Sequence, residues 1–419
     1  MRLIGCSVVG LLLLAPVHSP SLSGQSTQTG TSQGTFRATT NLVEVDVIIH
    51  DGDGRFVPGL TAEDLTLLED GKPQSIQQFY MVAHDPTGPS GSSSGGATVS
   101  EDRARRVFVL VVDEAHLAND SLSRVKKGAA LFLQNQFGPG DLGGIFVDNQ
   151  IFRGKLTTSR AELLAGVQSI KPGFENRQAI LQPFREFPRI PSEIDAARIA
   201  DGARELVEQL GMQACRDDAF LCEQNGGLNQ VENLIQNKAR LYTRQARVMT
   251  SRTVQNLQNV ISALRVIPGR KTIVFLSEGF FVEESRGTLQ TVAGNAARAG
   301  IAIYSIDGRG LIPGSSALPD VDRPEMSRST TFDTAEDGPT ILTSGTGGFR
   351  VHHIDDISRA FGMIARDTST YYVIGYQPAN SKMDGKYRKI EVKARASGLN
   401  IRARKGYTAT PLPPQTLGR

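Results

Sequence analysis

Three short, mostly apolar runs, each followed by an acidic residue, constrain the fold of this chain more than any other feature of its sequence. None of them alternates strictly with polar residues, as a half-exposed strand would, so each predicts a strand buried on both faces. The runs cover residues 106–112, 271–277 and 301–306, and they lead into Asp113, Glu278 and Asp307. Strands of this kind occur in parallel sheets that helices cover on both sides.

Segments with helical spacing lie between the buried strands. Helical spacing occurs at about 121–136, from Ser159 onwards and at 288–299, and two further strands are expected at 141–147 and 151–156. The recurrence predicts an α/β domain with a mostly parallel, doubly wound sheet over residues 103–369. Ligands of such sheets bind outside the carboxyl ends of the strands. We therefore expect a functional site where the three acidic residues meet.

A stretch rich in Arg, Gln, Glu and Ala interrupts this alternation at about 174–250. Apolar residues recur at helical spacing over 229–265, so the stretch predicts a helical insertion in the α/β domain. Within it, Cys215 and Cys222 are the remaining cysteines if the N-terminal segment with Cys6 is removed. An exported pair at this spacing favours a disulfide, while two buried or free thiols stay an alternative.

Both ends of the chain carry strand patterns outside the α/β domain. Valines alternate with acids over 43–47 in the segment 36–83, and apolar residues alternate with charged ones over 389–395 in the segment 370–409. Each segment has one apolar face that needs cover, and each is too short for a sufficient core of its own. We expect them to form one β-sandwich-like domain. Two independent β-modules, or a C-terminal sheet packed on the helices, stay alternatives.

The N-terminus has the layout of a secretory signal peptide. A positive residue precedes an apolar run over 3–15 and a small-residue pattern over 17–19. The run is shorter than the about 20 residues of a spanning helix, so we expect cleavage between Ser19 and Gly24. A lipid on Cys6 stays an alternative, although its box precedes the apolar run. A secreted or periplasmic protein with no integral membrane segment follows.

These patterns set the domain boundaries. They predict a signal peptide at 1–23, disorder at 24–35, a β-rich segment at 36–83, a Gly/Ser/Pro linker at 84–102, the α/β domain at 103–369, a β-rich segment at 370–409 and a tail at 410–419. Lys and Arg total 46 against 43 Asp and Glu, a net charge of +3. This near balance of positive and negative charge argues against a protein that binds nucleic acid.

Short motifs are spread along nearly all of residues 36–408. They comprise Val43 to Ile49 with the following Asp-Gly turn, residues 59–64, residues 68–71, Val107 to Asp113, residues 268–271 leading into Leu276-Ser277-Glu278-Gly279, Tyr304 to Gly308, residues 346–348, Tyr372 to Tyr376 and residues 404–407. As a set they resemble the von Willebrand factor type A domain, and more closely the related secreted bacterial family described mainly from acidobacteria. The resemblance implies a Rossmann-like, doubly wound sheet and a binding role.

Such domains typically hold Mg²⁺ on a D-x-S-x-S loop together with a Thr and an Asp from two other loops. Mg²⁺ needs about six oxygens in near-octahedral order. Here Asp113 is present, but Ala115 and Leu117 stand where the two hydroxyl residues belong. Glu278 takes the position of the third-loop acid, and Thr253 is the candidate for the second loop. The resemblance therefore implies a degenerate metal site with at most weak Mg²⁺ binding, and no cofactor.

The motifs of common enzyme classes are not supported by their context. The G-x-S-x-G at 91–95 lies in the linker with no strand before it, and the glycine-rich 345–348 lacks a P-loop lysine and is expected as a turn into a strand. Asp113 and Glu278 form a carboxylate pair, but nothing else indicates a sugar cleft. His116 lacks a paired His or Cys, so we expect it at the surface.

The expected function is that of a secreted, non-enzymatic binding or adhesion protein that engages a protein partner near the carboxyl-end rim of the sheet. A structural component of an envelope or secretion assembly, with the helical insertion as its contact surface, is one alternative. A hydrolase is the other. The sequence makes no prediction of the oligomeric state.

Overall fold

The computed structural model describes residues 42–84, 92–94, 105–173, 177–280, 285–310 and 337–411. The predicted signal peptide and the disordered stretch after it lie outside these residues, as do most of the linker and residues 412–419 of the tail. No described helix combines the length and apolar character needed to cross a membrane.

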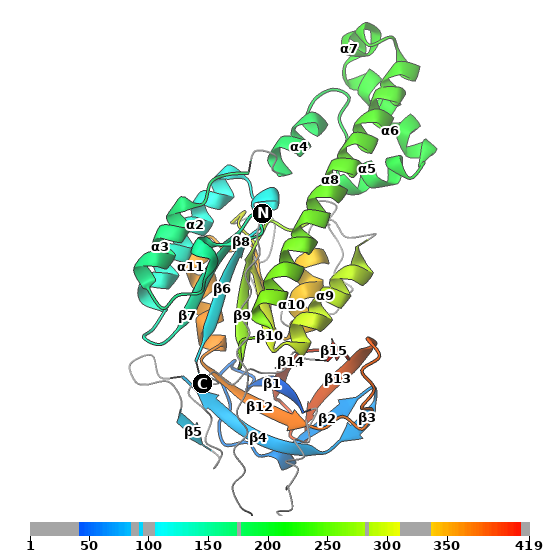
Figure 1. Cartoon of the computed structure of the whole chain (residues 1–419). Helices are drawn as coiled ribbons and strands as arrows, with labels where there is room; N and C mark the ends of the chain where they lie inside the picture. The colour runs from blue at the N-terminus through cyan, green and yellow to red at the C-terminus, as the bar shows by residue number, and fades with distance from the viewer. Residues whose placement is uncertain are drawn as a thin grey trace, which may run out of the picture. The chain divides into compact units, whose positions relative to one another are not determined.

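A six-stranded sheet lies at the centre of the α/β part (Figure 1). Its order is β11 (Arg350–Val351), β10 (Ile301–Ile306), β9 (Lys271–Leu276), β6 (Val107–Val112), β7 (Leu142–Val147) and β8 (Gln150–Ile151). All neighbouring pairs are parallel except β7 and β8. The prediction of an α/β chain with a mostly parallel sheet is confirmed.

Every residue of the central strands β6, β9 and β10 is buried, because helices cover both faces of this sheet. One face packs on α2 (Asn119–Asn135), α3 (Arg160–Ser169) and α11 (Ile357–Asp367), and the other on α8 (Leu228–Leu264), α9 (Arg286–Arg298) and α10 (Asp337–Thr346). Along β6, Phe108 and Leu110 enter the first core, while Val109 and Val111 enter the second. The alternation explains why the strand contains no polar position.

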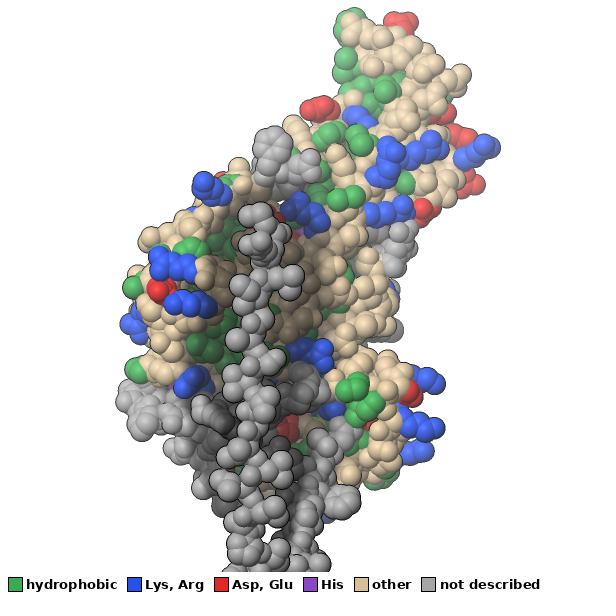
Figure 2. Space-filling model, in the orientation of Figure 1, with side chains coloured by type: hydrophobic (Ala, Val, Ile, Leu, Met, Phe, Trp, Pro, Cys, Tyr) green, Lys and Arg blue, Asp and Glu red, His purple; other side chains and the backbone are tan. Residues whose placement is uncertain are grey.

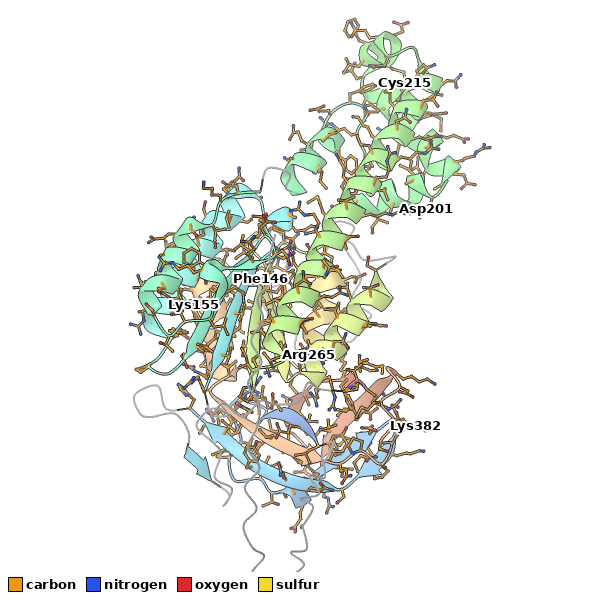
Figure 3. All side chains as sticks on the ribbon, viewed as in Figure 1. Phe146, Lys155, Asp201, Cys215, Arg265 and Lys382 are labelled. Carbon is orange, nitrogen blue, oxygen red and sulfur yellow. A yellow bond between two sulfur atoms is a disulfide. The ribbon has the colours of Figure 1, made fainter. Side chains whose placement is uncertain are left out.

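The helical insertion consists of four helices and the first part of a fifth. These are α4 (Arg177–Arg185), α5 (Glu193–Ala200), α6 (Arg204–Asp217), α7 (Ala219–Gln224) and the N-terminal part of α8. They share a hydrophobic core to which α8 contributes Val231, Ile235, Ala239 and Tyr242. A disulfide joins Cys215 and Cys222 and ties α6 to α7 (Figure 3).

Two antiparallel sheets combine strands from both ends of the chain. The first has the order β14 (Asn400–Ala403), β1 (Val43–His50), β12 (Thr370–Tyr376), β4 (Ile76–Ala83) and β5 (Ser92–Ser94). The second has the order β15 (Gly406–Thr408), β13 (Tyr387–Ala394), β2 (Leu65–Glu69) and β3 (Lys72–Gln74). N-terminal and C-terminal strands therefore pair directly, β1 with β12 and β14, and β2 with β13.

The two antiparallel sheets share one hydrophobic core, as a sandwich does. Val45 and Ile374 contribute from the first sheet and Leu67 from the second. Glu69 is buried there, and its Oε2 atom accepts hydrogen bonds from Tyr376 at 2.6 Å and Tyr407 at 3.1 Å. Burial and the neighbouring Glu69 carboxylate raise the pKa of Tyr407 to about 12, so its hydroxyl stays protonated and donates.

Two local predictions differ from the structure. The strand expected at 151–156 is only the two residues of β8, because Arg153 and Gly154 adopt positive φ in a short 3₁₀ helix, Phe152–Gly154, and end the extended backbone. The predicted linker contains β5, which pairs with β4 at the edge of its sheet. The glycine-rich stretch 345–348 does lead into a strand, β11.

Candidate functional site

The loop after β6 and the ends of β9 and β10 lie at the carboxyl end of the parallel sheet. Asp113 follows β6 directly, and its backbone N–H donates to the Leu276 carbonyl at 3.0 Å, which fixes the two strand ends together. A short 3₁₀ helix, Glu114–His116, comes next. Ser277 and Glu278 follow β9, and Asp307 follows β10. The parallel strand order therefore places all three predicted acids at this rim.

The Asp113 carboxylate is buried and bonded to three side chains from three segments. Its Oδ1 atom accepts from Thr253 Oγ1 at 2.8 Å, and its Oδ2 atom accepts from Ser277 Oγ at 2.8 Å. His116 Nδ1 lies 3.1 and 2.9 Å from the two oxygens. All four side chains are less than 7% exposed. The carboxylate thus joins the β6 loop, α8 and the end of β9.

Glu278 is bonded to the backbone of the loop after β6. Its Oε1 atom accepts from the Ala118 N–H at 2.8 Å, and its own N–H donates to the His116 carbonyl at 3.0 Å. Asp307 is held separately by Arg309 Nη2 at 2.5 Å and Arg350 Nη2 at 3.2 Å. Burial alone would raise the pKa of Asp307, but hydrogen bonds from Arg309 and the two positive charges outweigh burial and lower it.

The residues of the cluster do not fit Mg²⁺. The cluster offers one carboxylate and two hydroxyls, fewer than the about six oxygens that the ion needs, and the His116 ring nitrogen lies 3.1 and 2.9 Å from the two carboxylate oxygens, where the ion would bind. Leu117, in one of the hydroxyl positions, is buried in the hydrophobic core that also contains residues of α2 and β10. Within the described part of the chain, no group of three or more His, Cys, Asp or Glu could hold a metal ion.

Two residues of the cluster were not anticipated. His116 is 4% exposed, so the expectation of a surface histidine is wrong: its ring is buried as a partner for Asp113. Ser277 carries a signal that could have found it, since it is the first residue after a buried strand and precedes Gly279, whose N–H donates to its hydroxyl at 3.0 Å. Thr253 was predicted only from its position in the sequence, and its hydroxyl does donate a hydrogen bond to Asp113 from α8.

Polar side chains line the outer side of the rim. Glu114 is half-buried, and burial, with added repulsion from Asp148 and Asp113, raises its pKa. Asp148 is exposed and lies 3.5 Å from the guanidinium of Arg252 on α8. This outer side therefore presents carboxylates and an arginine on a base that the Asp113 hydrogen bonds hold rigid.

Comparisons with known proteins leave the family open. No family model matches the chain, and no curated protein sequence matches it. Among solved structures, an aerotolerance-related membrane protein from Bacteroides fragilis is 15% identical over 62% of this chain and 97% of its own, with a TM-score of 0.30. BatB from Bacteroides thetaiotaomicron is 15% identical over 63% and 97%, also at 0.30.

Proximal thread matrix protein 1 from the mussel byssus is 10% identical over 65% of this chain and 47% of its own, with a TM-score of 0.29. At these scores neither fold nor function is transferred from the three proteins. The candidate site therefore has to be interpreted from its own geometry.

Proposed function

We propose that the chain is a secreted or periplasmic, non-enzymatic protein-binding module with a von Willebrand A-like domain. Its partner binds at the carboxyl-end rim of the parallel sheet without a bridging metal ion. The observation that supports this proposal is the closed Asp113 cluster. Thr253, Ser277 and His116 use up both carboxylate oxygens, so the residues that would hold an ion instead bind three segments of the rim together.

A rigid rim favours recognition by shape and charge. Groups held in place before binding lose little conformational entropy when a partner docks. The exposed or half-buried Glu114, Asp148 and Arg252 supply the charges that a protein partner would complement. Binding through these groups needs no ion, in contrast to recognition through a metal shared with an acidic residue of the partner.

One observation favours the alternative, a structural component of an envelope or secretion assembly. Among its described residues, the helical insertion exposes five large apolar side chains, including Met212 by 47%, Phe220 by 67% and Leu228 by 38%. These three come from α6, from α7 and from the start of α8. Exposed apolar side chains that lie near each other are typical of contact surfaces between proteins.

Cross-linking in the native envelope, with the captured protein identified, tests the two functions against each other. A Glu114→Lys/Asp148→Asn variant changes the rim charges, and Asn tolerates the positive φ of Asp148. A Met212→Ser/Phe220→Ser variant removes apolar surface from the insertion. Glu63→Lys, on the sandwich, is the control. If the chain binds its partner at the rim, only the first variant loses the partner. If the chain is an assembly protein, only the second variant loses it, and that result would overturn the proposed function.

A further inference from the structure

The middle of α8 carries an unusual concentration of positive charge. Between Asn233 and Leu264 the helix contains no Asp or Glu, while Lys238, Arg240, Arg244, Arg247 and Arg252 supply five cations. The chain as a whole is almost neutral, with 46 basic and 43 acidic residues. The charge of this segment is therefore local and is not a consequence of composition.

Three of these arginines and two apolar residues form an exposed stripe, defined here as Arg240, Leu241, Arg244, Arg247 and Val248. All five are exposed, Leu241 by 49% and Val248 by 62%. At about 100° per residue the arginines fall in one row along the helix and the two apolar residues in a second row beside it. The opposite side of α8 is buried in the insertion core.

The other two cations have partners inside the chain. Lys238 Nζ donates to four carbonyls of residues 183–188 at 3.0 to 3.3 Å, and Arg252 pairs with Asp148. By contrast, Arg240 and Arg244 form no ion pair with a described residue. Figure 2 shows Lys, Arg and apolar side chains on the surface of the helical insertion as a whole. The charges of Arg240 and Arg244 are thus available to a binding partner.

We propose that the stripe binds an acidic amphipathic helix of a protein partner. Arg240 and Arg244 are four residues apart, about 6 Å along α8, and Leu241 and Val248 are seven residues apart, about 10.5 Å. A partner helix that carries acids at i and i+4, beside a row of apolar residues, matches both rows at once. This inference rests on the proposed function and names the chemistry of the partner. Arg252 and Thr253 follow the stripe on α8 and contact residues of the rim, so the stripe and the rim are adjacent along one helix.

Other anionic partners match the stripe less well. Single-stranded nucleic acids stack their bases on aromatic side chains, and the stripe has none. A helix that lies on a membrane surface buries an apolar face that commonly carries Trp, Phe or Leu. The stripe offers only Leu241 and Val248 beside its arginines.

Fluorescence anisotropy with the full chain tests the inference. The probe is a labelled helical peptide of about 18 residues with glutamates at i, i+4 and i+7 and leucines at i+1 and i+8. A second peptide has Gln in place of each Glu. Vesicles containing phosphatidylglycerol and a short DNA duplex serve as the competing anionic probes. The variants are Arg240→Glu/Arg244→Glu and the milder Arg240→Gln/Arg244→Gln.

The matched control is Arg204→Glu/Arg216→Glu, which removes two exposed arginines from α6 of the same insertion. We expect the Glu peptide to bind the wild type about tenfold more tightly than the Gln peptide does, since several exposed ion pairs contribute. Both stripe variants lose this preference and the control keeps it. Higher salt weakens binding of the Glu peptide, because exposed charges are screened.

Equal binding of the two peptides, or an unchanged affinity in the stripe variants, overturns the inference. So does binding of the vesicles or the duplex without binding of the Glu peptide. These outcomes are distinct from failure of the proposed function, which is measured on the captured native partner with the rim variant. If the rim variant loses that partner while the Glu peptide fails to bind, the rim function stands and the stripe inference is wrong.

Discussion

At the scale of single residues, the buried carboxylates accept hydrogen bonds from donors in distant segments. Asp113 bonds Thr253 across 140 positions and Ser277 across 164. Asp141 is held by Arg106 at 2.6 and 2.9 Å. A buried charge without such partners would cost several kcal/mol, so each carboxylate acts as a cross-link between the elements that carry its donors.

The first prediction concerns Mg²⁺ at Asp113. We expect binding weaker than ~1 mM, because Ala115 and Leu117 offer no oxygen and the carboxylate is already bonded within the chain. Isothermal titration calorimetry with MgCl₂ measures the affinity. Micromolar binding in the wild type that vanishes in Asp113→Ala would show that the site is intact after all.

The second prediction concerns the pH dependence of stability at Lys271. Burial lowers the pKa of this amine to about 8, and Nζ donates to the carbonyls of Ile267 and Gly269 at 2.8 and 2.7 Å. In the unfolded chain the pKa is about 10.4, so between about pH 8 and 10.4 the unfolded state holds more protons. The contribution of Lys271 to the free energy of unfolding therefore rises with pH in this window.

Urea unfolding of the wild type and Lys271→Met at about pH 7.5 and about pH 9.5 measures this effect. The difference, wild type minus variant, should become more favourable to the wild type at the higher pH, since other titrating groups are common to both proteins. A difference that does not change with pH, or that changes in the opposite direction, contradicts the prediction.

At the scale of elements, α8 connects two hydrophobic cores. Its first part packs in the insertion through residues such as Val231 and Ile235, and its last part covers the parallel sheet through Leu257 and Ile261. Thr253 lies just before the second part and reaches the Asp113 cluster. One continuous helix therefore carries the insertion, the exposed stripe and a contact of the rim.

The third prediction concerns the disulfide within this insertion. Replacing Cys215 and Cys222 by Ser should lower the stability of the insertion by about 2–3 kcal/mol, because the bond closes a short loop between α6 and α7. The α/β core should change little, since neither cysteine belongs to its clusters. Hydrogen exchange resolved by segment separates the two effects. The bond itself is absent if both thiols of non-reduced, denatured exported protein can be alkylated.

At the scale of the whole molecule, the sandwich depends on both ends of the chain. β12 lies between β1 and β4, and β13 pairs with β2, so C-terminal strands take N-terminal strands as neighbours in both sheets. The shared core likewise contains residues from both segments. Neither segment can form these sheets alone.

The fourth prediction follows from this arrangement. In a chain cut to residues 103–409, β12 and β13 lose their N-terminal neighbours, so amides of 370–408 should lose protection from hydrogen exchange. The amides of β6 and β9 in the parallel sheet serve as the internal reference. Unchanged protection of 370–408 in the shortened chain would mean that the C-terminal strands fold without the N-terminal segment.

Much of the fold was predictable because burial leaves a local trace in sequence. Val107–Val112 is apolar at every position since both of its faces are covered, and the helical spacing over 229–265 reports the buried side of α8. The order of strands and helices also placed Asp113 and Asp307 at the carboxyl end of the sheet. The strand expected at 151–156 failed, because positive φ at Arg153 is not visible in its residue type.

Hydrogen-bond partners and exposed surfaces were decided only by the tertiary structure. No local pattern connects Asp113 to Thr253, or turns the ring of His116 inward, since these contacts exist only once α8 has packed on the sheet. The stripe on α8 became visible in the same way: the arginines were in the sequence, but their common exposed side depends on which face the insertion buries. The periodicity of apolar residues reflects neighbours along the chain. A site is formed by residues that are far apart in the sequence and come together only in the folded protein.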